Sequence, residues 1–152
     1  CRSRRPPLDN VNALLSFAYS LLASDCAAAL EGAGLDPYVG FLHRARPGRR
    51  SLALDLMEEL RTVLADRFVL SCINQKVLNA KHFEKQENGA VLLTEEGRRA
   101  FLNAWQQKKR EVITHPFLKE KLCWGLVPYV QALLLARTLR GDLEVYPPFF
   151  WK

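Results

Sequence analysis

The sequence predicts a mainly α-helical, bundle-like domain with one small β-hairpin. Apolar residues recur every three or four positions in long stretches, the first of which contains Val11, Leu14, Leu15, Ala18, Leu21 and Leu22. Only HFEKQENGAVLLT reads as two short strands around a turn, at Asn88-Gly89. The chain of 152 residues is 49% hydrophobic and 25% charged, which is typical of a globular domain with a real core.

The first residues differ in character from the rest. Residues 1–8 are basic and contain prolines, and the chain begins with Cys1, so we expect an extended linker from a preceding domain. Residues 9–152 then form the helical domain. Asp9 or Asn10 can cap its first helix, which we expect to run to Glu31, before two glycines.

The middle of the chain alternates loop and helix. Residues 34–50 are predicted to be loop, because prolines and glycines interrupt them. Ser51 is a plausible cap for a second helix, and a third, apolar helix is expected over about residues 67–78.

The last third is predicted to hold two more helices and a tail. Thr94 opens a helix that reaches about Ile113, and Pro116 fits the first turn of a last helix that runs to about residue 140. Pro128 should kink this helix, and Gly141 should end it. We expect the aromatic tail EVYPPFFWK to pack on the body or on a partner.

Charge, cysteine content and hydropathy indicate which classes of protein the chain could belong to. The net charge of +6 and the pI of about 9.4 are compatible with nucleic acid but do not establish it. The four cysteines form no CxxC pair, which favours buried or idle thiols over a zinc or disulfide scaffold. We find no apolar run of membrane-span length and no signal segment, so we expect a cytoplasmic protein without a membrane partner.

One region has the residues of a divalent-cation site. His43 lies in a loop bounded by glycine and proline, and the following helix carries Asp55, Glu58 and Glu59 as neighbours on one face away from its apolar stripe. An imidazole and carboxylates can together hold such an ion. The alternatives are a structural histidine and carboxylates that favour the helix dipole. The short connection between the two elements favours the metal site.

Arginines between the histidine and the helix would suit a polyanion across that metal, since arginine forms bidentate pairs with phosphate. They are Arg44, Arg46, Arg49 and Arg50. A solvated, flexible loop is the alternative. For a second basic cluster, Lys108 to Arg110 at a helix end, we prefer the solvated interpretation. Phe101, Trp105 and Trp124 are better assigned to the core than to base stacking.

The sequence lacks the motifs of several other kinds of enzyme site. The sequence has no GxxxxGK[ST] loop, no GxGxxG, no HExxH and no His-Asp dipeptide. Ser51 has no convincing His and Asp setting for acyl transfer.

Five blocks of sequence resemble one known family. PPLDNVNALLSFAYSLL, GLDPYVGFLHR, SLALDLMEELR, ADRF and YPPFFWK are similar to the CRISPR-associated adaptation integrase, the Cas-one family. The likeness covers nearly the whole chain, and the order and spacing of the blocks make it specific. The resemblance corresponds to the helical C-terminal domain of the family. The residues of the middle block and of YPPFFWK are most like the form found with type I-C systems.

The resemblance implies a metal-dependent DNA endonuclease and integrase of spacer acquisition. It implies Mg²⁺ or Mn²⁺ as cofactor, and DNA, a homodimer and the Cas-two adaptation protein as partners. His43 matches the family's metal-binding histidine, Glu58 matches its helix carboxylate, and Asp55 matches a second acidic position. The family's first glutamate precedes the PPLDN segment and has no match here, so the resemblance implies a partial site.

Two other readings remain open at this point. The chain could be a non-catalytic DNA-binding or assembly module, in which the acidic face is solvated and the basic patches contact DNA. It could also be a helical dimerisation domain.

Overall fold

The computed structural model describes residues 9–37 and 51–151, so the expected linker and most of the loop before Ser51 lie outside the described residues. The helices are α1 Asn10–Gly32, α2 Ser51–Leu60, π-helix η1 Arg61–Asp66, α3 Arg67–Asn74, 3₁₀-helix η2 Ala80–His82, α4 Glu95–Lys109, 3₁₀-helix η3 Trp124–Leu126 and α5 Val127–Leu139. The strands are β1 Phe83–Lys85, β2 Val91–Leu93, β3 Val112–Thr114 and β4 Lys121–Cys123. The mainly helical fold class is confirmed.

Helix α1 has the predicted limits. The Asp9 carboxylate accepts hydrogen bonds from the backbone N–H of Asn12 at 2.8 Å and from its Nδ2 at 2.9 Å, which caps the first turn. At the other end Gly34 adopts a φ of +81°, a left-handed conformation that costs glycine little. The backbone N–H of Leu35 then bonds to the carbonyl of Leu30 at 2.8 Å and closes the helix.

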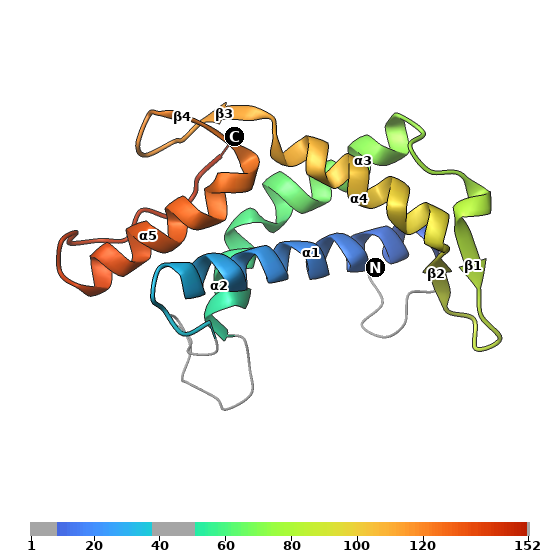
Figure 1. Cartoon of the computed structure of the whole chain (residues 1–152), viewed down its shortest axis with the longest axis horizontal. Helices are drawn as coiled ribbons and strands as arrows, with labels where there is room; N and C mark the ends of the chain where they lie inside the picture. Colours follow the sequence, from blue (N-terminus) through green and yellow to red (C-terminus); the bar gives the residue numbers. More distant parts are fainter. Residues whose placement is uncertain (1–8, 38–50, 152) are drawn as a thin grey trace.

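Figure 1 shows α1 running along the length of the molecule, with the β1–β2 hairpin at its N-terminal end and α5 at its C-terminal end. The segments α2, η1 and α3 follow one another without a break and lie against α1. Contrary to expectation, α1 has the length and apolar character of a possible membrane span. Its fully buried residues, such as Ala18 and Leu22, pack inside the hydrophobic core.

An aromatic cluster forms one end of the core. The ring of Phe101 stacks on Phe17 at 5.5 Å between centroids and meets Phe68 at 5.0 Å. Trp105 contacts Phe68 edge-on at 5.1 Å. Phe101, Trp105 and Trp124 are all buried, which confirms their assignment to the core.

The predicted hairpin and its turn are confirmed. Strands β1 and β2 pair antiparallel, with Phe83 opposite Leu93. Gly89 has a φ of +86° in the turn, which explains the glycine at that position.

Two helix predictions over residues 110–126 were wrong. Helix α4 ends at Lys109, and residues 112–123 form a second hairpin in which Val112 pairs with Cys123. Each of its strands has only three residues, too few to show an alternating pattern. Pro116 lies in its turn, and the last helix begins at Val127.

The predicted kink at Pro128 was also wrong. Pro128 lies in the first turn of α5, where the missing N–H would have no intrahelical partner. The predicted end is confirmed, since α5 stops at Leu139 and Gly141 follows with a φ of +87°.

Candidate functional site

Helix α2 carries the described part of the predicted site. Its buried stripe, which includes Leu56 and Leu60, joins the core beside α1. Asp55 is half-buried, whereas the Glu58 side chain is 57% exposed and forms an ion pair with Arg61 at 3.4 Å. An exposed pair of this kind contributes little to stability, so the Glu58 carboxylate can exchange partners readily.

Asp55 and Glu58 are three positions apart, which places them on one face of the helix. Two carboxylates offer hard oxygen donors of the kind that Mg²⁺ and Mn²⁺ prefer. Within residues 9–37 and 51–151, the structure brings together no group of three His, Cys, Asp or Glu side chains that could hold a metal ion. These two residues therefore fit part of a donor set, and a complete site needs further ligands.

The other predicted site residues cannot be placed. His43 and the four arginines, Arg44, Arg46, Arg49 and Arg50, lie outside the described residues. The approach of His43 to Glu58 stays a prediction.

Glu59 lies one turn after Asp55, and its carboxylate has partners in the C-terminal tail. Its carboxylate turns under the C-terminal tail, where it accepts hydrogen bonds from the Tyr146 hydroxyl at 2.9 Å and the backbone N–H of Phe149 at 3.0 Å. The side-chain amide of Gln131 in α5 donates to it at 3.3 Å. The expected packing of the tail on the body is confirmed, and Glu59 is its polar anchor.

The network extends to the β3–β4 hairpin. The ring Nδ1 of His115 accepts the backbone N–H groups of Phe117 and Leu118, each at 3.1 Å, so the ring proton of the neutral imidazole is on Nε2. That N–H donates to the Gln131 side-chain oxygen at 2.7 Å. His115 and Gln131 are both fully buried. Sequence reasoning missed this network, because its members come from four separate segments and share no motif.

Burial also affects the acid–base behaviour of the network. Desolvation raises the pKa of Glu59 above its ordinary value, against the hydrogen bonds from Phe149, Tyr146 and Gln131, which lower it, and the nearby carboxylate of Asp55 adds to the rise. Desolvation and the nearby carboxylate of Glu59 raise the pKa of Tyr146, so its hydroxyl stays protonated and can donate. The network is thus a carboxylate surrounded by neutral donors.

A second polar group lies where α2 continues into η1. The Tyr19 hydroxyl donates to the Asp66 carboxylate, and the Arg61 guanidinium lies 6.0 Å from the centroid of the Tyr19 ring. The Nε of Arg61 is buried and has no hydrogen-bond partner in the part of the chain that the structure describes. Nothing in the sequence pattern indicated that Tyr19 and Arg61 would meet beside Glu58.

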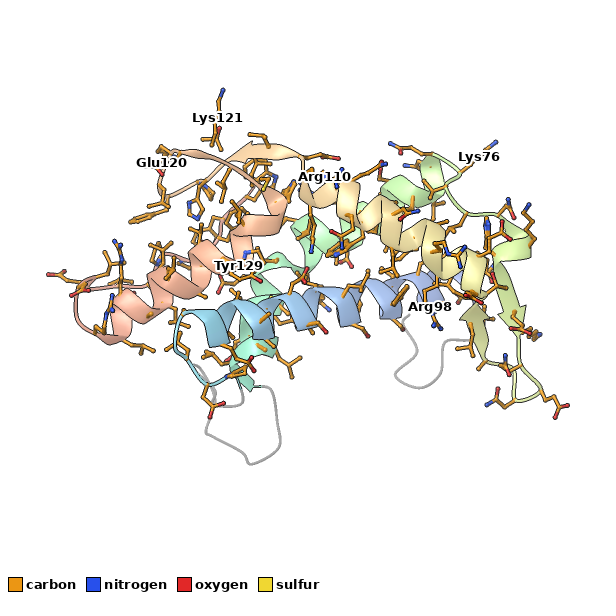
Figure 2. The ribbon with its side chains drawn as sticks, viewed as in Figure 1. Lys76, Arg98, Arg110, Glu120, Lys121 and Tyr129 are labelled. Atoms are coloured by element: carbon orange, nitrogen blue, oxygen red, sulfur yellow. The ribbon has the colours of Figure 1, made fainter. Side chains whose placement is uncertain are left out.

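The second basic cluster has structural partners. Lys109 pairs with Asp25 of α1 at 3.1 Å. Lys108 pairs with Glu111 at 3.2 Å and lies 5.7 Å from the centroid of the Trp124 ring. Arg110 is exposed beyond α4 (Figure 2). The two lysines fasten α4 to its neighbours, so a role in the fold describes them better than a solvated patch.

Comparison with known proteins agrees with the resemblance seen in the sequence. Residues 1–107 match the model of the family described as CRISPR associated protein Cas1. The chain is 64% identical over 151 residues to "CRISPR-associated endonuclease Cas1 2" of Rhodospirillum rubrum, and 54% identical to "CRISPR-associated endonuclease Cas1 1" of Chlorobaculum tepidum. Each match covers 99% of this chain and 44% of the relative, so the chain spans less than half the length of these relatives.

Solved structures of similar proteins superpose on this chain over nearly its whole length. A casposase bound to its integration product superposes with a TM-score of 0.85 at 29% identity, over 99% of this chain and 44% of that one. A CAS1 protein from Thermotoga maritima superposes with a TM-score of 0.81 at 31% identity, over 92% of this chain and 43% of that one. A chain of a Cas6-RT-Cas1–Cas2 complex gives 0.78 at 29% identity, over 100% of this chain and 45% of that one.

Proposed function

Because the chain belongs to the family of CRISPR associated protein Cas1, we propose that it is the helical catalytic portion of a metal-dependent DNA endonuclease and integrase of spacer acquisition. The observation that carries the proposal is the pair of carboxylates, Asp55 and Glu58, one turn apart on α2 and directed away from its buried stripe. The finer assignment to type I-C systems belongs to the same proposal.

In this proposal Asp55 and Glu58 hold a divalent cation together with His43. The ion, when bound, supplies a Lewis acid that polarises a phosphoryl oxygen and stabilises charge on the attacking or leaving oxygen. Carboxylate ligands suit Mg²⁺ and Mn²⁺ alike, and an imidazole ligand favours Mn²⁺. We propose that a further glutamate comes from the N-terminal portion that the longer relatives possess.

The arginines after the histidine would hold the DNA. Arg44, Arg46, Arg49 and Arg50 can form bidentate contacts with phosphates, which position the backbone without reading its sequence. DNA as partner is supported by the casposase bound to its integration product. A Cas2 partner is supported by the Cas1–Cas2 complexes with the same fold. We include a homodimer and a cytoplasmic location in the proposal.

The test is metal-dependent DNA cleavage by a version of the protein extended at its N-terminus to the length of its relatives. We expect His43→Ala and Glu58→Gln each to abolish cleavage in Mn²⁺. Glu84→Gln, which alters an exposed glutamate on β1, serves as control and should leave the rate unchanged. Full activity in both site variants would refute the proposal.

A second function is favoured by the small donor set of the described residues together with the net charge of +6. The chain by itself would then bind DNA without cleaving it. A salt titration separates the two functions. Binding that falls steeply with salt and ignores added Mn²⁺ supports a DNA-binding module, because it reflects released counterions. Binding that strengthens with Mn²⁺ supports the metal site.

A further inference from the structure

Glu59 is the neighbour in sequence of the proposed ligand Glu58, but its surroundings make it unsuited to bind metal. Its Oε1 atom accepts hydrogen bonds from Gln131, Tyr146 and Phe149, and its Oε2 atom lies 2.9 Å from the same Tyr146 hydroxyl. A carboxylate oxygen has room for about two such donors, so Oε1 is saturated. A metal could replace the donors on Oε1 only by detaching the tail.

In the network around Glu59, each hydrogen bond fixes the orientation of the next group. Two backbone donors fix the tautomer of His115, whose Nε2–H fixes which end of the Gln131 amide is the oxygen. The amide nitrogen of Gln131 is therefore directed at Glu59, at the Tyr146 hydroxyl at 2.7 Å and at the carbonyl of Pro147 at 3.2 Å. Each buried donor meets an acceptor, which is the condition under which a buried polar network holds one arrangement.

Helix α2 needs such a support. It has ten residues, which is too short for a helix to be stable without tertiary contacts. Its apolar stripe meets α1 on one side, and the π-helix η1 follows it directly. The contacts of Glu59 add a polar attachment to α5 and the tail, and they occur about one turn from Asp55 and next to Glu58.

We propose that Glu59 is a positioning residue of the metal site: by fastening the tail and α5 to the end of α2, it sets the direction in which Asp55 and Glu58 present their carboxylates. The inference rests on the proposed function. It assigns to Glu59 no contact with metal or DNA, since Glu59 acts through the orientation of the helix.

The experiment measures Mn²⁺ affinity by electron paramagnetic resonance in the N-terminally extended protein, for Glu59→Ala, Glu59→Gln and Tyr146→Phe. We expect Glu59→Ala to weaken Mn²⁺ binding about tenfold, the usual effect of losing a group that orients ligands. Glu59→Gln keeps the volume and one acceptor, and Tyr146→Phe removes one donor, so each should weaken binding less. Amide hydrogen exchange of the metal-free protein should show faster exchange at Phe149 in all three.

The matched control is Phe101→Leu, which loosens the aromatic core on α4 without touching the tail. It should lower the melting temperature and leave Mn²⁺ affinity unchanged. If Mn²⁺ affinity follows melting temperature across all variants, or if the Glu59 and Tyr146 variants keep full affinity, the positioning role is refuted. Should Glu59→Ala fail to fold, the Glu59→Gln and Tyr146→Phe variants decide.

Glu58→Gln separates this inference from the proposed function. Loss of Mn²⁺ binding in Glu58→Gln with full binding in the Glu59 variants refutes the positioning role alone. Full Mn²⁺ binding in Glu58→Gln refutes the metal site itself. Loss in Glu58→Gln and partial loss in the Glu59 variants support both.

Discussion

At the scale of single residues, adjacent positions on α2 have opposite environments. Successive residues of a helix differ by about 100° in direction. Glu58 is therefore exposed beside Arg61, whereas Glu59 is surrounded by donors from the tail and α5. Both are glutamates in one acidic run, so their residue types could not distinguish an exposed carboxylate from an anchored one. Only the partners, about 90 positions away in the sequence, do so.

The cysteines allow a test at the same scale. Burial raises the pKa of Cys72 to about 11, and burial and nearby carboxylates raise the pKa of Cys26 further. At pH 8 only about one Cys72 thiol in a thousand would be the reactive thiolate. In a Cys1→Ser background, we expect Ellman's reagent to label the half-exposed Cys123 quickly and the other two only as the protein opens.

Urea provides the control for this labelling, since all three thiols should react at similar rates in the unfolded chain. Rapid labelling of Cys26 or Cys72 in native buffer would contradict the buried positions.

At the scale of elements, local signals predicted what local interactions determine. The Asp9 cap and the Asn88-Gly89 turn each act within four residues, and both were readable in the sequence. The β3–β4 hairpin was not, because its short strands depend on its own turn and on the contact of Trp124 N–H with the carbonyl of Glu111 at 3.0 Å. Pro116 fitted a helix start as well as a turn.

Two glycines in helices should respond in opposite ways to alanine. A Cβ at Gly97 would lie 2.5 Å from the backbone oxygen of His82, which cannot move freely because it accepts the N–H of Thr94 at 2.9 Å. We expect Gly97→Ala to lower the free energy of unfolding by about 1–3 kcal/mol. Apart from the backbone of its own helix turn and its chain neighbours, Gly32 has no atom within 4 Å of its Cβ position, so Gly32→Ala should be neutral or stabilise by up to about 1 kcal/mol.

Urea denaturation measures both changes. Equal effects of the two substitutions would show that helix propensity alone governs these positions and that the close contact of α4 with η2 has no influence.

At the scale of the whole molecule, the tail joins elements that are far apart in the sequence. The ring of Phe149 lies 5.4 Å from that of His115 and 5.8 Å from that of Trp124 between centroids, and Trp151 also contacts Trp124. With the hydrogen bonds to Glu59, these contacts connect α2, α5 and the β3–β4 hairpin. The sequence indicated a packed tail, but its binding site exists only once the fold has brought these segments together.

Neighbouring phenylalanines of the tail test this connection. Phe149 is 4% exposed and Phe150 is 77% exposed. We expect Phe149→Ala to lower the free energy of unfolding by about 3–5 kcal/mol, and Phe150→Ala to change it by less than about 0.5 kcal/mol. Urea denaturation followed by tryptophan fluorescence measures both. A small effect of Phe149→Ala would mean that the tail is not part of the cooperative core.

The π-helix between the acidic residues and α3 has an evolutionary consequence. A π-turn holds one residue more than an α-turn, and Arg61–Asp66 can be viewed as an α-helical turn that gained an insertion. Loss of one codon here would restore regular α-winding and leave α3 facing the core as it does now, because the wider π-turn takes up the extra residue locally. Length differences of one residue among homologous genes should therefore be more frequent within this short stretch than inside α2 or α3, where a deletion would turn the buried stripe out of the core.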